Sequence, residues 1–292
     1  MNTRTLGVIS AFVAVIIWGS VFTVKEYLLN FLDPSQINFI NAFITTTFYL
    51  ITVLITKQSL KVNKRVLCIL VLSGIAGISI TRLACDIGIK LVGGTAASVF
   101  SSLIPVMCVI FECIILRKST NKVTILSILT SILGIFLVIG MPKGLNNSFI
   151  GYLWLFISNC AWILYCHFCS LISDANIKQN ISMFYQFGGA SLFLLPSLFT
   201  NNLDFSVLIR KEILFSLLFL GLANGVIAYG LFTFAVKSIG VLTSNVINNF
   251  IPVVTLILNF LFFQQSVGLM QFFGVSLIIL SIISITLQKN IC

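Results

Sequence analysis

Charge is what this sequence has least of. Only 8% of its 292 residues are charged, acidic residues number 7, and His167 is the single histidine. A water-soluble protein of this length needs far more charge to cover its surface, so the composition excludes a soluble globular domain. The sequence also has no paired-histidine metalloprotease helix, no nucleophile elbow and no phosphate-binding glycine loop, so an enzyme is not expected.

Other scarcities exclude particular partners. The eight cysteines are scattered, mostly inside apolar runs, and do not form a disulfide framework. Cys166 and Cys169 flank His167, but one short helical stretch cannot build a closed tetrahedral site, so we expect no metal and no cofactor. The formal net charge of +10 does not indicate nucleic acid, because the basic residues lie between apolar runs, where anionic lipid headgroups would meet them.

Long apolar runs make up most of the chain, and 59% of the residues are hydrophobic. Each run is roughly 20 residues long, enough for a helix to cross a hydrocarbon core of ~30 Å. The runs are continuous rather than alternating, which favours helices over the strands of a barrel. The sequence therefore predicts an all-α polytopic membrane protein. Its ten expected spans are 6–29, 35–56, 66–89, 94–116, 123–141, 150–172, 181–199, 213–236, 240–263 and 267–287.

The chain also repeats itself at a constant spacing of 147 residues. Two five-helix units are therefore expected, 1–145 and 146–292. Five is an odd number, so the second unit enters the membrane in the opposite sense and the two form an inverted repeat. Such carriers hold their solute near the bilayer midplane, between the units. The matched residues are Gly74 with Gly221, Lys90 with Lys237, Gly93 with Gly240 and Pro105 with Pro252.

The distribution of Lys and Arg orients the expected bundle. With a cytoplasmic N-terminus, eleven of these residues lie on the inside and five on the outside, with Arg82 within a span. Both termini are therefore expected in the cytoplasm. Lys25 ends the first span, and Lys90 and Lys237 lie at turns, so all three are interpreted as interfacial anchors.

Arg82 and Asp86 are the sharpest candidates for a site. They are four residues apart in the third span and share one helix face. A charge within a span costs ~2.5–3.5 kcal/mol and indicates a functional residue by default. The two charges either neutralise each other or face a carboxylate (Arg82) and an ammonium or coupling proton (Asp86). Their counterparts, Tyr229 and Thr233, are uncharged, which favours the second interpretation.

Two polar stripes occupy matched places in the fourth and ninth spans, just before Pro105 and Pro252. Each has i, i+3, i+4 spacing and so lies along one side of a helix. Small polar residues can hold two helices together, but three asparagines in a span favour a wet cavity. The stripes are Ser98, Ser101 and Ser102, and Asn245, Asn248 and Asn249.

Aromatic residues are the remaining candidates. Trp18 and Trp162 lie near mid-membrane, away from the interfaces where Trp usually gathers. Together with Tyr165, Tyr185 and Tyr229 they can line a cavity for an apolar or cationic group. Packing within an ordinary core is the alternative.

The opening Trp18-Gly19-Ser20 followed by Lys25, together with the repeated segments, resembles the EamA branch of the drug/metabolite transporter superfamily over essentially the whole chain. The resemblance implies a ten-helix inverted-repeat carrier of a cytoplasmic membrane. The resemblance also implies outward transport of small organic solutes, often amino acids or related metabolites.

We therefore expect a secondary transporter that exports a small polar or zwitterionic, amino-acid-like solute by alternating access. Its expected partners are that solute, membrane lipids and H⁺ as the coupling ion, with no nucleic acid, in a monomer or dimer. The expected location is the inner membrane of a bacterium. The Ile, Asn, Lys and Phe content is typical of an AT-rich genome, and many such genomes belong to host-dependent bacteria. Uptake or exchange of a metabolite such as S-adenosylmethionine is the alternative within this class. An intramembrane enzyme and a scaffold without transport are the alternatives outside it.

Overall fold

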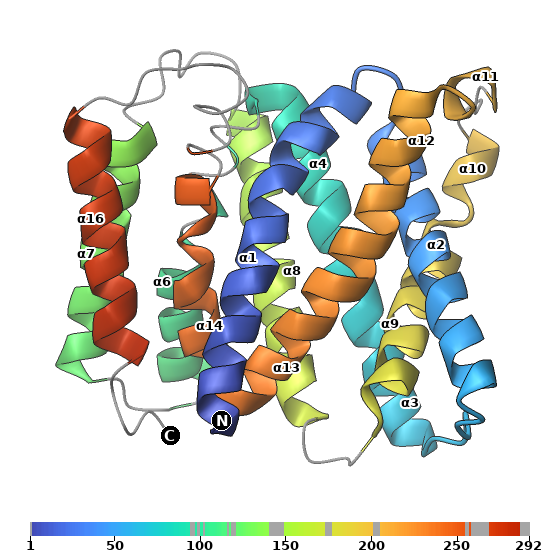
Figure 1. Cartoon of the computed structure of the whole chain (residues 1–292), viewed down its shortest axis with the longest axis horizontal. Helices are drawn as coiled ribbons and strands as arrows, with labels where there is room; N and C mark the ends of the chain where they lie inside the picture. The colour runs from blue at the N-terminus through green and yellow to red at the C-terminus, as the bar shows by residue number, and fades with distance from the viewer. Residues whose placement is uncertain are drawn as a thin grey trace.

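The computed structural model describes residues 2–93, 97, 100–101, 103–115, 117, 121–139, 149–172, 177–200, 205–254, 257 and 269–286. Within these ranges every regular element is a helix (Figure 1). The expected residues Ser98 and Ser102 lie outside the described ranges, as do parts of several expected spans.

The first half of the chain contains α1 (Thr3–Leu28), α2 (Pro34–Ile55), α3 (Lys64–Gly74), the π-helix η1 (Ile75–Ile80), α4 (Thr81–Val92), α6 (Ile104–Ile110), the π-helix η2 (Phe111–Ile115) and α7 (Lys122–Ile139). The second half contains α8 (Phe149–Leu171), α9 (Gln179–Leu194), α10 (Ser197–Thr200), α11 (Phe205–Leu208), α12 (Lys211–Leu218), the π-helix η5 (Phe219–Ala228), α13 (Tyr229–Ile239), α14 (Val241–Asn248) and α16 (Leu269–Thr286).

Five helices of the described part are long and apolar enough to cross a membrane. They are α1, α2, the continuous helix Lys64–Val92, α8 and the continuous helix Lys211–Ile239. Large apolar side chains such as Ile16, Leu54 and Phe215 are exposed on their outer faces, as lipid contact requires. The chain is thus a multi-pass membrane protein.

The structure bears out the two predicted turns. α4 ends at Gly93 with φ +84°, and α13 ends at Gly240 with φ +83°. Residues with a side chain rarely adopt this left-handed backbone, so glycine is the usual residue after a helix. Upstream of each turn, η1 and η5 interrupt the regular helix at matched positions of the repeat.

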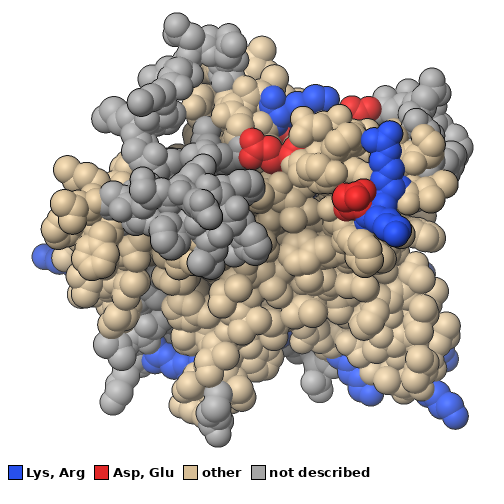
Figure 2. Space-filling view, turned by 45° about the horizontal axis from the view of Figure 1, so that its top comes forward, with Lys and Arg blue, Asp and Glu red and all other residues tan. Residues whose placement is uncertain are grey.

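The matched helices run in opposite directions. In Figure 1, Lys64–Val92 rises from the lower to the upper edge of the bundle, whereas Lys211–Ile239 descends. The start of α1 and the end of α16 lie at the same, lower edge. Figure 2 shows a broad uncharged band on the visible face, with most charged side chains beyond it at the two edges.

Close backbone contact holds α3 against α9. A Cβ atom at Gly74 would overlap the carbonyl oxygen of Gln186. We expect Gly74→Ala to lower the free energy of unfolding by about 1–3 kcal/mol, because backbone atoms cannot move aside as a side chain can. Thermal unfolding of the purified protein in detergent measures the effect.

Gly188→Ala in α9 is the matched control. Its Cβ would meet only Thr46 Cγ2, at an ordinary contact distance of 3.6 Å, and alanine favours a helix by about 0.8–1.0 kcal/mol over glycine. A Gly74→Ala protein that melts with or above the Gly188→Ala protein would contradict this account of the α3–α9 contact.

Candidate functional site

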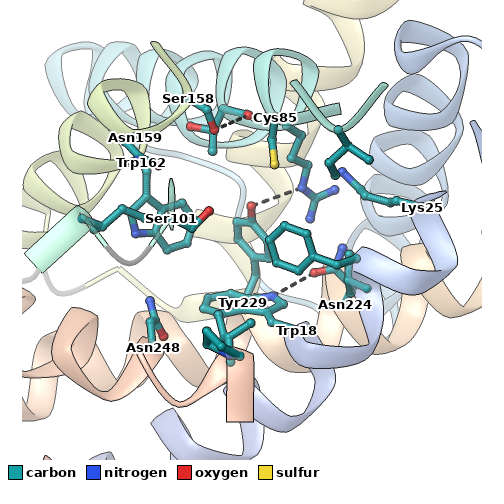
Figure 3. A pocket seen from close by; sticks show the side chains of 18 residues that line it. Trp18, Lys25, Cys85, Ser101, Ser158, Asn159, Trp162, Asn224, Tyr229 and Asn248 are labelled. Carbon is teal, nitrogen blue, oxygen red and sulfur yellow. Dashed lines mark hydrogen bonds between the residues drawn. The ribbon is translucent and has the colours of Figure 1, made fainter. Parts of the chain in front are cut away.

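A cavity of about 130 Å³ lies where α1, α4, α8, η5, α13 and α14 meet. Eighteen residues line it (Figure 3). Its walls therefore come from both halves of the chain. The expected residues that line it are Trp18, Arg82, Ser101, Trp162, Tyr229 and Asn248.

Interlocked aromatic rings form one wall of this cavity. The Trp18 and Trp162 rings contact edge to face at 5.4 Å, and Tyr229 lies 5.6 Å from Trp18. Both indole N–H groups are already committed: Trp18 donates to Asn224 at 2.9 Å and Trp162 to Asn245 at 2.7 Å. Because their N–H donors are occupied, the two indoles offer the cavity ring surface and no hydrogen-bond donor.

The other two expected aromatic residues do not line the cavity. Tyr165 is fully buried, and its ring is tilted against those of Trp162 and Tyr229. The Tyr185 hydroxyl instead donates to the Leu60 carbonyl at 2.6 Å. For these two, packing accounts for the side chain's surroundings.

Arg82 is buried, with 4% of its surface exposed, and it lines the cavity. Its Nε donates to the Tyr229 hydroxyl at 3.2 Å, and its Cζ lies 4.5 Å from the centre of the Tyr229 ring and 5.5 Å from that of Phe187. Nη1 and Nη2 have no hydrogen-bond partner among the described residues. The two terminal nitrogens of the guanidinium, with four N–H donors, are therefore left for a ligand.

Asp86 pairs with Lys25, not with Arg82. The Lys25 ammonium lies 2.6 Å from Asp86 Oδ1, and Asn38 donates to Oδ2 at 2.8 Å. The interpretation of Lys25 as an interfacial anchor is thus wrong: it is buried, with 5% exposed, because α1 packs close enough to α4 for its side chain to reach the carboxylate. The interpretation that Arg82 and Asp86 neutralise each other is also wrong, because the Asp86 carboxylate pairs with Lys25. Asp86 is fully buried and does not line the cavity.

The asparagine stripe divides among three different environments. Asn245 accepts from Trp162 and donates to the Val241 carbonyl, so it supports the wall. Asn249 donates to Ser131 on α7 at 2.5 Å. For this residue the structure shows a helix–helix contact, which is the alternative to a cavity. Only Asn248 lines the cavity. The reason is local: α14 ends at Asn248, so the next residue is no longer on its face.

Sequence reasoning missed several lining residues. Lys25 was assigned to the interface because it ends an apolar run, and the sequence alone does not show how α1 crosses α4. Asn224 was detectable, since an asparagine within an apolar run is as costly as those of the stripe. Cys85, Ser158 and Asn159 also line the cavity. Ser101, the one described member of the serine stripe, donates to the Ala97 carbonyl at 3.0 Å.

Comparison with known proteins finds similarity along most of the chain. The profile of the EamA-like transporter family matches residues 5–140 and again 149–287. The Bacillus subtilis transporters YrdR and YyaM are each 24% identical to this chain, over 87% and 91% of it and 83% and 88% of their own lengths. The Salmonella typhimurium inner membrane transporter YicL is 23% identical over 99% of this chain and 98% of its own.

A solved structure shares the fold. A crystal structure covering 96% of each chain superposes with a TM-score of 0.77 at 16% sequence identity. The relatives' names describe transporters without a substrate. The likeness in fold therefore extends over nearly the whole chain and leaves the solute to be argued from the cavity.

Proposed function

Since this chain belongs to the EamA-like transporter family, we propose that it is a secondary transporter that exports a small organic solute across a bacterial inner membrane by alternating access. One observation carries the proposal: a cavity between the two halves of the chain contains a buried guanidinium whose terminal nitrogens have no partner among the described residues. A charge buried within a membrane costs free energy, and such a residue is usually functional. Binding the carboxylate of a solute is a function that fits Arg82.

The proposed architecture is ten helices in two inverted units, 1–145 and 146–292. The opposite directions of Lys64–Val92 and Lys211–Ile239 support it, as do the matched glycine turns. The side chains at the centre support it too. Arg82 and Tyr229 occupy equivalent repeat positions and hydrogen-bond to each other, as expected for residues beside a pseudo-two-fold axis.

Rocking of the two units about this axis would open the cavity to each side in turn. The π-helices η1 and η5 lie in helices that flank the cavity, and such segments often mark hinges or functional sites. Described Lys and Arg residues dominate the lower edge in Figure 1, so we place that edge, with both termini, in the cytoplasm. They include Arg4 at the start of α1, Lys57 just after α2, Lys64 and Arg65 at the start of α3, Lys122 at the start of α7, Lys178 just before α9 and Lys237 near the end of α13.

Proton coupling is assigned to Asp86. Its carboxylate holds Lys25 in this structure, so protonation would release Lys25 and loosen α1 from α4. The Asp86→Asn protein, assayed over a range of pH, tests this part. Transport with an unchanged pH dependence would remove the proton from the mechanism.

Flux in proteoliposomes tests the proposed function. Purified protein is reconstituted, loaded with unlabelled amino acids or small carboxylates, and assayed for counterflow of the labelled compound. We expect saturable counterflow that protein-free liposomes lack. Tyr185→Phe, outside the cavity, should leave it unchanged, whereas Trp18→Ala should reduce it. A compound that binds and stabilises the protein but shows no flux would contradict transport.

A further inference from the structure

The cavity carries one uncompensated positive charge. Of its described lining residues only Lys25 and Arg82 are charged. Lys25 is neutralised by Asp86 at 2.6 Å, whereas Arg82 pairs with no carboxylate of the described residues. The fixed fork of a guanidinium matches the two oxygens of a carboxylate and can bind both at once. The net charge of the site thus favours an anion.

The described residues that line the cavity offer no partner to an ammonium group on a solute. Asp86 is the acidic residue nearest to Arg82 in the sequence. Its two carboxylate oxygens already accept from Lys25 and Asn38, and it does not line the cavity. Aromatic faces can hold a cation, but Arg82 already lies over the Tyr229 ring at 4.5 Å, and a second cation there would be repelled. Burying an unpaired ammonium is costly.

A neutral acceptor is present instead. Asn248 Oδ1 has no hydrogen-bond partner among the described residues, while its Nδ2 donates to Asn245 at 3.3 Å. Asn248 comes from α14 in the second half of the chain, and in Figure 3 it lies across the cavity from Lys25 and Cys85. A carbonyl oxygen accepts from a hydroxyl or an amide N–H without needing a charge.

Apolar side chains make up much of the remaining lining. Val21, Ile89 and Ile251 line the cavity beside the Trp18 and Trp162 rings. A branched hydrocarbon body would fit there without leaving a polar atom unpaired.

From these observations, and resting on the proposed transport function, we propose that the site selects a carboxylate monoanion with a neutral hydrogen-bond donor and an apolar body. A 2-hydroxy acid or an N-acylated amino acid has this chemistry. Arg82 binds the carboxylate and Asn248 accepts from the hydroxyl or amide, so the solute bridges the two halves. A zwitterionic amino acid binds less tightly and an amine does not bind.

Four compounds with one hydrocarbon skeleton test the selection. They are 2-hydroxy-4-methylpentanoate, 4-methylpentanoate, leucine and 3-methylbutylamine. Affinity is measured by thermal stabilisation of the purified protein, and transport by counterflow in proteoliposomes. We expect the hydroxy acid to bind about threefold more tightly than 4-methylpentanoate, because one neutral hydrogen bond contributes about that much. We expect it to bind at least about tenfold more tightly than leucine.

Two variants assign the selection to its residues. Asn248→Ala should abolish the preference for the hydroxy acid over 4-methylpentanoate and leave binding of the latter unchanged. Arg82→Gln should weaken both acids by about tenfold or more. The Asn248→Ala result stands on its own if Arg82→Gln does not fold. Tyr185→Phe is the control and should match the wild type.

The outcomes separate this inference from the proposed function. Leucine or 3-methylbutylamine binding as tightly as the hydroxy acid would overturn the inference, and so would a wild-type protein that binds neither acid. If leucine is transported in preference, transport stands and the selection fails. If the hydroxy acid binds with the expected preference but does not cross, the selection stands and transport fails.

Discussion

Asp86→Asn is expected to lower the free energy of unfolding by about 3–5 kcal/mol, the usual cost of removing one partner of a buried ion pair. The substitution leaves the Lys25 ammonium buried, with 5% of the residue exposed, and without its carboxylate. Asn38 also loses a charged acceptor at 2.8 Å. Thermal and denaturant unfolding of the purified protein in detergent would measure the loss.

The double variant Lys25→Met/Asp86→Leu is its control. With both charges replaced by apolar groups of similar size, most of the stability should return, because neither half of the pair is left unmatched. A double-mutant cycle then gives the coupling between the two residues. A single variant as stable as the wild type, or a double variant as unstable as the single one, would contradict the buried pair.

Arg82→Gln should have the largest effect on transport and little on stability. Counterflow of 2-hydroxy-4-methylpentanoate should fall at least tenfold, because a charged hydrogen bond contributes about 1.5–3 kcal/mol. Stability should stay within about 1 kcal/mol of the wild type, since the substitution removes an unpaired buried charge along with the Tyr229 contact. This combination distinguishes a solute-binding arginine from a structural one.

Arg82→Lys completes the comparison. Lysine keeps the charge but lacks the planar fork, so transport should recover only in part. Flux that is unchanged in Arg82→Gln, or a loss of flux that is matched by a collapse in stability, would remove Arg82 from the solute site.

The centre of the molecule shows what an internal repeat can predict. The spacing of 147 residues pairs Arg82 with Tyr229, and these two side chains are in contact. The first helices of the two halves also meet here through Trp18 and Trp162, although the repeat spacing does not pair these two residues. Under the proposed inverted architecture, equivalent residues meet near the axis between the halves, which is where this cavity lies. Arg82 in the first half, at the position that Tyr229 occupies in the second, gives this site its charge.

Other features depend on how helices are rotated against each other, which periodicity does not specify. Arg82 and Asp86 share a helix face, yet one lines the cavity and the other faces Lys25 and Asn38. Asn248 and Asn249 are adjacent, but the end of α14 sends them to different partners. Charge within a span singles out Arg82 and Asp86, and tertiary packing determines what each of them contacts.

Labelling of Cys85 tests the central claim most directly, because Cys85 lines the cavity. A protein with Cys85 as its only cysteine, in right-side-out and inverted vesicles, is exposed to a membrane-impermeant thiol reagent. Alternating access predicts modification from both faces, slowed from both by 2-hydroxy-4-methylpentanoate. Modification from one face alone, with or without that compound, would contradict it.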